Sequence, residues 1–433
     1  MASTNIYYNR AADYNPDEVA DGDSIEAEFD AIQRGFLSVQ SEIEKKIDSD
    51  DVAQSLSLKA NAAEVAPKAG DAAQVFSVAA ATDDDHAVNR AKAQAMIDAR
   101  AGSAGAFNFR NKITDGRFDF WYEGTSQTAS GYGSDTMSNN AHSGSTKVHS
   151  RQPLVVGVDL PAIDCPSATY FSRTIVTSVA GAANYVTKGL KIENVGTLAG
   201  KTVTLSFYAK ADAVKNISFE LEQYFGTGGS ASITGIGAQL VSLSTSWVRY
   251  SRTFTIPSIS GKTVGTGNFL NVLFGFDIGS TYSAQYGGQV QQSGTFDLAC
   301  VQLEEGSIAT PFEELPMEIS QQRVNRYFRT SYPYGTAIGS TATFSPLWYK
   351  CNSGDVYNYL GWICFDSKMR STPAVTTYSQ TTGASGKVSD TVHVLDLASV
   401  ASPMDSGIMF YVNNVTLTYP VEFHWHYKAD ARL

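Results

Sequence analysis

Near the start of the chain, apolar side chains recur at alternating spacings of four and three residues. The series consists of Ile25, Phe29, Ile32, Phe36, Val39 and Ile43. A helix buries so narrow a stripe best against copies of itself, so the pattern predicts a coiled coil over residues 23–48. Bulky phenylalanine and isoleucine at the core positions favour three parallel strands, and Lys46 interrupts the repeat. An intramolecular helical hairpin is the alternative, but no second helix carries a matching stripe. We therefore expect a homotrimer.

The segments on either side of this helix show little periodicity. We interpret residues 1–22 as an extended arm that docks on another protein, with a frayed chain end as the alternative. Residues 49–105 are rich in alanine and are broken by Pro67 and Gly70, so they predict a helical spacer.

Beyond Gly105 the chain takes up the two-residue alternation of β-strands. Only six of the 49 aromatic residues precede this point, which places a domain boundary there. The clearest alternation predicts strands over residues 202–209, 217–221, 247–256 and 296–303.

The β-rich part divides into two domains. We expect one β-domain over residues 106–315, a short helical connector over 316–328 and a second β-sandwich over 329–433, which has the length of an immunoglobulin-like sandwich. Residues 124–150 contain almost no large apolar side chain, and they predict a long polar loop. The expected fold class is mainly β with an N-terminal helical stalk.

Charge is unevenly distributed along the chain. Residues 1–105 carry 19 acidic and 9 basic side chains, whereas the remainder carries 24 acidic and 23 basic ones. Neither part has the basic patch that a phosphate backbone requires, so we expect no nucleic-acid partner. No apolar run approaches the length of a membrane span, and the first residues lack the features of a signal peptide, so we expect no membrane insertion.

The four cysteines, Cys165, Cys300, Cys351 and Cys364, are widely scattered and show no metal-binding spacing. This spacing disfavours structural zinc and does not imply a disulfide framework. We therefore expect buried free thiols in a protein that folds in a reducing cytoplasm.

The C-terminal domain is rich in aromatic residues of the kind that stack on sugar rings. A flat aromatic face covers the apolar side of a sugar, and nearby polar groups bind its hydroxyls. The candidates are Trp348, Tyr349, Asp355, Tyr357, Tyr359 and Trp362. The alternative is that these rings belong to the sandwich core or to a trimer interface.

Two further patterns have a chemical and a structural interpretation. His424 and His426 alternate on one strand face and could bind a transition metal in a trimer, although surface or interface histidines are the simpler interpretation. Glu220 and Glu222 could mimic a glycosidase carboxylate pair, but a solvated strand edge is more usual. No nucleophile elbow, zinc-protease helix or repeated β-helix coil is present, so we expect no enzyme activity.

Several stretches resemble known families. Residues 113–121, 206–211 and 296–304 are similar to strands of jelly-roll carbohydrate-binding modules. Residues 76–97, 306–313, 321–328, 370–376 and 425–433 resemble tail-fibre proteins of tailed bacteriophages. The resemblance implies a trimeric fibre on the virion, anchored to a baseplate or tail protein by its N-terminal end. Its C-terminal domains would bind a host surface polysaccharide. A polysaccharide depolymerase and a purely structural collar or baseplate fibre are the alternatives.

The jelly-roll resemblance also implies sites in the first β-domain. Aromatic residues near its Gly-rich loops could hold sugar, and these are Tyr132, Tyr224, Tyr282 and Tyr286. Asp119 and Asp297 stand where such modules often bind structural calcium, although two carboxylates are too few to complete a calcium site. We expect no other cofactor.

Overall fold

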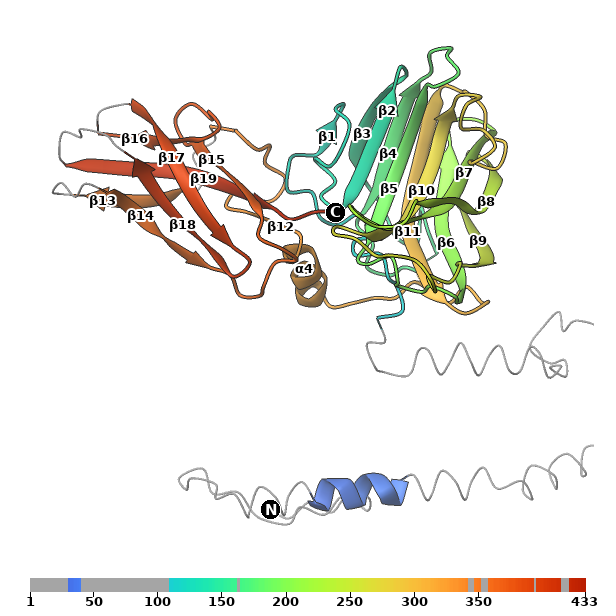
Figure 1. Cartoon of the computed structure of the whole chain (residues 1–433). Helices are drawn as coiled ribbons and strands as arrows, with labels where there is room; N and C mark the ends of the chain where they lie inside the picture. The colour runs from blue at the N-terminus through green and yellow to red at the C-terminus, as the bar shows by residue number, and fades with distance from the viewer. Residues whose placement is uncertain are drawn as a thin grey trace, which may run out of the picture. The chain divides into compact units, whose positions relative to one another are not determined.

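The computed structural model describes residues 30–39, 109–161, 164–341, 346–351, 357–392, 395–413 and 420–433 (Figure 1). The chain divides into two compact units, Met1–Asn89 and Arg90–Leu433. Within the described ranges, no helix is both long and apolar enough to cross a membrane.

In the first unit, residues 30–39 form an α-helix within the predicted coiled coil. Ile32 is 37% exposed and Phe36 is 73% exposed on this helix, while Val39 is half-buried. Ile25, Phe29 and Ile43, the arm over 1–22 and the spacer over 49–105 lie outside the described residues. The coiled coil and the homotrimer therefore remain predictions.

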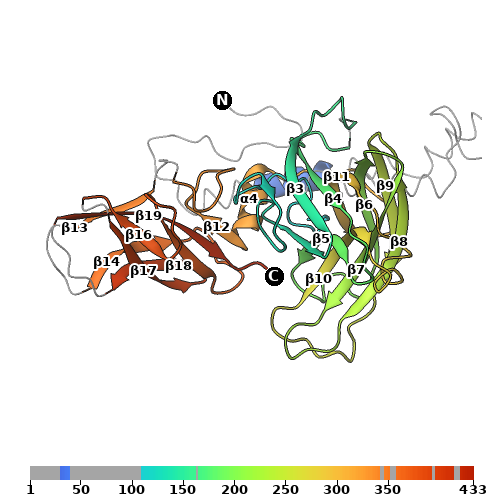
Figure 2. The same ribbon diagram turned by 90° about the horizontal axis from the view of Figure 1, so that it is seen from above.

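The second unit begins with two facing antiparallel sheets. The six-stranded sheet has the order β1 (Ser126–Gln127), β3 (Thr146–Pro153), β4 (Tyr170–Thr177), β11 (Gly294–Glu305), β6 (Thr202–Ala211), β9 (Val248–Thr255). The five-stranded sheet has the order β2 (Ser138–Ser143), β5 (Tyr185–Ile192), β10 (Phe269–Ile278), β7 (Lys215–Tyr224), β8 (Ile233–Leu243). Figure 2 shows the strands of the two sheets on opposite sides of this domain. Alternate side chains from both sheets, such as Phe207 and Phe274, fill the core between them.

The four strands with the clearest alternation in the sequence are confirmed. The predicted strands over 202–209, 217–221, 247–256 and 296–303 correspond to β6, β7, β9 and β11. The predicted long loop over 124–150 is wrong, because these residues contain β1, β2 and the first half of β3. The sequence Ser138–Ser143 of β2 is polar and lacks large apolar side chains, yet its backbone pairs with β5 along its whole length.

A buried charged cluster lies between the sheets. The Lys188 ammonium is 2.8 Å from Asn140 Oδ1 and 3.5 Å from Asp135 Oδ2. His149 Nε2 lies 3.2 Å from the same Asp135 oxygen, and the His149 ring stacks on Trp121. The side chains of Asp135, His149 and Lys188 are fully buried, so these groups depend on one another for compensation.

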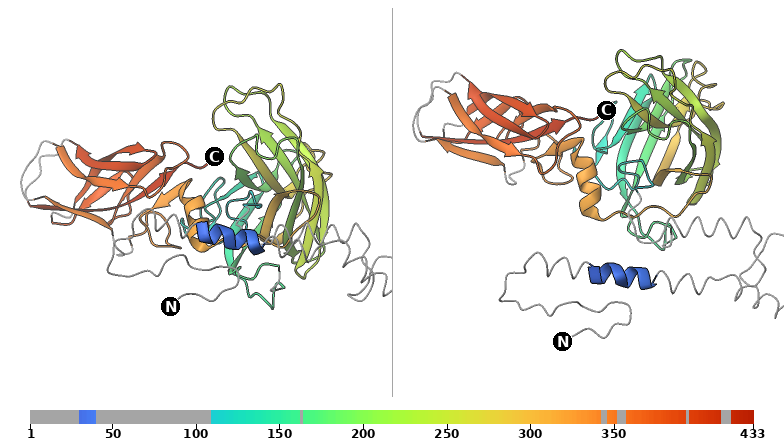
Figure 3. Two further views of the ribbon diagram at one scale, coloured as in Figure 1. Left: turned by 90° about the horizontal axis from the view of Figure 1, so that it is seen from below. Right: turned by 60° about the horizontal axis from the view of Figure 1, so that its bottom comes forward.

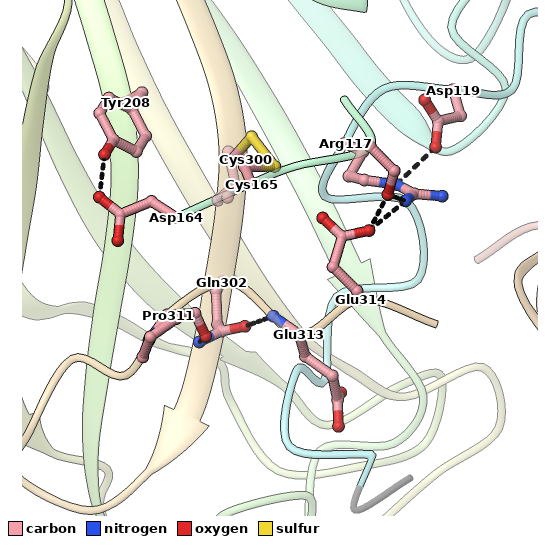
Figure 4. Close-up of a disulfide and its surroundings, with 12 residues drawn as sticks. Arg117, Asp119, Asp164, Cys165, Tyr208, Cys300, Gln302, Pro311, Glu313 and Glu314 are labelled. Atoms are coloured by element: carbon pink, nitrogen blue, oxygen red, sulfur yellow. Dashed lines mark hydrogen bonds and ion pairs between the residues drawn. A yellow bond between two sulfur atoms is a disulfide. The ribbon is translucent and has the colours of Figure 1, made fainter. Parts of the chain in front are cut away.

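The expectation of free, reduced thiols is wrong for two cysteines. Cys165 and Cys300 form a disulfide that joins the segment before β4 to β11, with their Cα atoms 6.7 Å apart (Figure 4). This distance suits a disulfide, but the 135 residues between the partners conceal the pairing in the sequence. Cys364 is a free thiol and is exposed, also contrary to expectation.

Helix α4 (Met317–Asn325) follows this first β-domain and lies within the segment predicted as a connector (Figure 3). The remaining strands are β12 (Phe328–Thr330), β13 (Leu347–Cys351), β14 (Tyr357–Cys364), β15 (Ala374–Ser379), β16 (Lys387–Asp390), β17 (Leu395–Met404), β18 (Gly407–Asn413) and β19 (Val421–Asp430). One path of pairing runs β12-β19-β16-β17-β18-β14, and β13 and β15 also pair with β19. Phe410, Phe423 and Trp425 lie in the apolar core of this second β-domain.

Polar contacts just after the last strand connect the second β-domain to the first. Arg432 donates to Asp430 at 2.6 Å, contacts Glu123 Oε2 at 2.8 Å and donates to the carbonyl of Thr136 at 3.0 Å. Its guanidinium also lies over the rings of Tyr132 and Phe328. Only 3% of the Arg432 side chain is exposed, so this contact is a buried part of the structure.

Candidate functional site: the outward face of the five-stranded sheet

Three strands of the five-stranded sheet place polar side chains in one row on its outward face. The register pairs Asn271 of β10 with Lys191 of β5 on one side and with Glu222 of β7 on the other. Residues directly opposite each other in adjacent strands point to the same face. Because the neighbouring Leu270 and Val272 point into the core, this row points away from it. An ammonium, an amide and a carboxylate are thus presented side by side.

Asn271 is the centre of the row and has unused hydrogen-bonding capacity. Its Nδ2 donates to Glu222 at 3.3 Å, whereas its Oδ1 is buried without a hydrogen-bond partner in the described residues. Only 4% of Asn271 is exposed. A buried amide oxygen without a partner is costly, and a ligand that donates a hydrogen bond removes that cost.

An aromatic pair borders this row. Tyr224 and Phe269 face each other across β7 and β10, with their ring centroids 4.7 Å apart. The Lys191 ammonium lies 4.3 Å from the Phe269 ring centroid and donates to the carbonyl of Leu433 at 2.7 Å. Burial lowers the pKa of Lys191 below its usual range, while nearby Glu222 acts in the opposite direction.

On the other side of the row, Gly189, Leu273 and Glu220 form the next row across the same three strands. Gly189 is required here, because a Cβ at this position would come within 2.9 Å of Asn271 Oδ1. The amide of Asn271 therefore packs directly against the backbone of Gly189. The face therefore combines aromatic surface with hydrogen-bonding groups.

Glu220 is not a solvated edge residue as the sequence suggested. β7 is an inner strand between β10 and β8, and Glu220 is fully buried. Its carboxylate accepts hydrogen bonds from the backbone N–H of Gly235 and from the side chain of Gln285. Burial raises the pKa of Glu220 to about 7. Glu220 is thus covered by Gly235 and Gln285 and is not open to a ligand.

The other predicted sugar-binding residues of the jelly roll are engaged in packing. Tyr286 is buried against Gly275 and hydrogen-bonds Glu220, so it does not offer its ring to a ligand. Tyr282 packs edge-on against Tyr185, with ring centroids 5.6 Å apart. Tyr132 is half-buried beneath the guanidinium of Arg432, 4.7 Å from its ring centroid. Of the four predicted residues, Tyr224 forms the aromatic pair beside the row, and the ring centroid of Tyr132 lies 5.6 Å from the Lys191 ammonium.

The aromatic candidates of the second β-domain lie on different strands and faces. Trp348 of β13 is 66% exposed and stands opposite His424 of β19. On the β14–β18 pair, Tyr359 is 46% exposed opposite Tyr411, and Trp362 is 38% exposed opposite Met409. Tyr349 stands opposite Phe423 and is 38% exposed. Asp355 and the side chain of Tyr357 lie outside what the structure describes.

Each of the two predicted calcium ligands pairs with arginine. Asp119 lies 2.6 Å from Arg117, which also contacts Glu314 (Figure 4). Asp297 accepts hydrogen bonds from Arg173 at 2.7 and 2.8 Å. Burial raises the pKa of Asp119, and Arg117 opposes this shift. Calcium at these positions remains a prediction without support from the arrangement.

The two histidines of β19 differ in their surroundings. His426 is buried, stacks on Tyr332 with ring centroids 4.1 Å apart, and its Nδ1 lies 3.1 Å from Ser331 Oγ. His424 is half-buried. In the described ranges, no group of three or more His, Cys, Asp or Glu side chains is arranged to hold a metal ion. The idea of a metal shared between copies stays untested.

A family model described as a carbohydrate binding domain matches residues 180–266. The match spans β5 to β9 and therefore includes Lys191, Glu222 and Tyr224 of the outward face. The chain carries a jelly-roll domain like that of carbohydrate-binding modules. Phe269 and Asn271 of β10 lie just beyond the matched residues and complete the same face.

Solved structures give further similarities. A structure described as CBM4 is 17% identical, with 45% of this chain and 99% of that chain covered and a TM-score of 0.24. The N-terminal cellulose-binding domain of a Cellulomonas fimi β-1,4-glucanase is 19% identical, with 33% and 83% covered and a TM-score of 0.23. The enzymatically active domain of a tailspike protein from bacteriophage CBA120 is 9% identical, with 46% and 22% covered and a TM-score of 0.26. No curated protein matches the chain.

Proposed function

We propose that the jelly-roll domain binds a surface glycan across the row formed by Lys191, Asn271 and Glu222. Together with the family match, the observation that carries this proposal is the buried Asn271 oxygen without a partner, placed between a cation and a carboxylate. A sugar hydroxyl both donates and accepts hydrogen bonds, so one pyranose can satisfy all three groups. The Tyr224–Phe269 pair supplies an apolar edge for the same ring.

At the level of the whole chain, we propose a non-catalytic attachment fibre of a tailed bacteriophage, located on the virion. The resemblance of the segments around α4 and β19 to tail fibres supports this proposal. The exposed rings of Trp348, Tyr359 and Trp362 offer a further stacking surface for glycan in the second β-domain. A trimer joined by the 23–48 helix would multiply weak sites into a high avidity.

The test is glycan binding by the full chain and its variants. Asn271→Ala and Tyr224→Ala are each expected to weaken binding to the recognised glycan by about tenfold, the effect of losing about 1.4 kcal/mol of polar or stacking contact. Glu222→Gln tests the carboxylate, and Glu305→Gln is its matched control. Glu305 is half-exposed, pairs with Lys201 and lies on the other sheet.

Three results decide between the parts of the proposal. Unchanged glycan binding by Asn271→Ala, Tyr224→Ala and Glu222→Gln would remove the site from this face. If only Trp348→Ala or Trp362→Ala reduces binding, recognition belongs to the second β-domain. An increase in reducing ends on incubation with host polysaccharide would contradict the non-catalytic assignment.

A further inference from the structure

A pocket of about 390 Å³ lies where helix α4 meets the end of β5 and the segment that enters the jelly roll. Its volume falls within the range of small-ligand sites in proteins. Its lining shares no residue with the row of Lys191, Asn271 and Glu222, so it is a separate candidate site. Cationic side chains dominate its chemistry, in a chain with a net charge of -11.

Two cations on the pocket wall form no salt bridge with a carboxylate in the described part of the chain. The Lys112 ammonium donates to the carbonyl of Phe109 at 2.7 Å and makes no ion pair. Arg323 of α4 uses only Nη2, which donates to the carbonyls of Asn111 and Ile113 at 3.2 and 3.3 Å. Its Nε and Nη1 make no hydrogen bond to the described residues. Burial lowers the pKa of Arg323, and Glu313, which lies outside the pocket lining, acts in the opposite direction.

A third cation is already neutralised and is held in a fixed orientation. Arg326 donates from Nε and Nη2 to the two oxygens of Glu193, both at 2.8 Å. The hydroxyl of Tyr327 donates to the same carboxylate at 3.0 Å. Glu193 is therefore paired with Arg326. The lining keeps a net positive charge, which comes from Lys112 and Arg323. Opposite charges attract a ligand that carries an anionic group.

The pocket also has apolar surface. Phe109 is 46% exposed at its edge, and its backbone has a φ of 45°, which is uncommon for a residue other than glycine. An aromatic face beside two cations suits a ring-shaped ligand with a carboxylate better than a small inorganic anion.

We infer that this pocket binds an acidic sugar, with its carboxylate between Lys112 and Arg323 and its ring against Phe109. The inference goes beyond the proposed glycan site on the sheet and does not depend on it. It assigns to the chain a second, charge-selective contact for anionic polysaccharide. Both cations reach solvent, so the affinity falls as salt increases.

The experiment uses the full chain and a trisaccharide of galacturonic acid, with binding followed by titration calorimetry at low salt. The trisaccharide is expected to bind, and Lys112→Gln is expected to weaken binding by about tenfold, the loss of one charge-assisted contact. Lys262→Gln, which removes the same charge from an exposed loop, should not change the affinity. Phe109→Ala should also weaken binding. Thermal unfolding of each variant shows that it is folded.

Three outcomes would overturn the inference. The first is equal binding of the acid and its methyl ester, which would exclude recognition of the carboxylate. The second is sodium acetate that displaces the trisaccharide at equal carboxylate concentration, which would reduce the pocket to an anion site without sugar recognition. The third is wild-type affinity in Lys112→Gln with loss of affinity in Tyr224→Ala. That result would place the acidic sugar on the sheet face and would leave the proposed function standing.

Discussion

Replacement of Lys188 by methionine tests the buried cluster of Asp135, His149 and Lys188. The substitution keeps the apolar stem and removes the charge that lies 3.5 Å from Asp135 Oδ2. At an effective dielectric constant of about 20, two unit charges at this distance attract by roughly 5 kcal/mol. Part of this lost attraction is offset, because the variant no longer buries an ammonium that has to lose its hydration. The expected loss in the free energy of unfolding is therefore about 3–5 kcal/mol, as for other buried pairs deprived of one partner.

The loss should depend on pH, because His149 contacts the same carboxylate. In the wild type, burial and the charge of Lys188 lower the pKa of His149 to about 4, so the imidazole is neutral. Without Lys188 this pKa rises, and a protonated His149 can compensate Asp135 in acid. Burial lowers the pKa of Lys188 to about 8, so the comparison is made below that pH, where Lys188 is charged. Urea unfolding should show a smaller loss for Lys188→Met at pH 5.5 than at pH 7.

The control is the double variant Asp135→Asn/Lys188→Met, in which neither charge remains. Its stability should lie closer to that of the wild type than to that of the single variant. A loss below 1 kcal/mol in Lys188→Met, or a double variant as unstable as the single one, would refute the claim that the two buried charges compensate each other.

Three further predictions follow from the described contacts. Burial raises the pKa of Glu220 from its usual 4.5 to about 7, so the wild type loses about 3 kcal/mol of stability relative to Glu220→Gln between pH 4.5 and pH 8. This raised pKa favours folding in acid, and parallel pH profiles of urea unfolding for the two proteins would contradict it. Reduction of the Cys165–Cys300 disulfide should cost about 2–4 kcal/mol, and Cys364→Ser is the control that should leave thermal unfolding unchanged. Arg432→Ala should destabilise the chain by about 2–3 kcal/mol and separate the unfolding of the two β-domains in calorimetry, whereas Lys368→Ala, which removes an exposed pair with Asp405, should have almost no effect.

Local periodicity was enough to predict the four strands with the clearest alternation of apolar and polar residues. The alternation around Phe207 and Phe219 identified β6 and β7, because each strand buries one face and the signal lies within a few residues. The same reasoning failed for β2, whose backbone pairing depends on β5 and not on its own small polar side chains. Such pairing is determined by the neighbouring strand, so the residues of β2 alone do not predict it.

The candidate site was harder to predict from the sequence, because it too depends on the pairing of strands that are distant in sequence. Lys191, Asn271 and Glu222 become neighbours only through the register of three strands, and no local pattern connects them. Tyr224 was found as an aromatic residue beside a Gly-rich loop. Tyr286 fitted the same criterion but is buried, because the segment that carries it folds back over the sheet against Gly275. Only the path of the loop between β10 and β11 distinguishes the two residues.

The position of β11 has a consequence for synthesis of the chain. This strand lies between β4 and β6, although it follows both by a long stretch of sequence. Until the ribosome has released it, β4 and β6 each have an edge with unpaired backbone groups, and such edges bind other unfinished chains. The yield of soluble protein should therefore depend on how fast the segment between β6 and β11 is translated. Slower translation at low temperature prolongs this exposed interval, whereas chaperones that cover strand edges protect the chain during it.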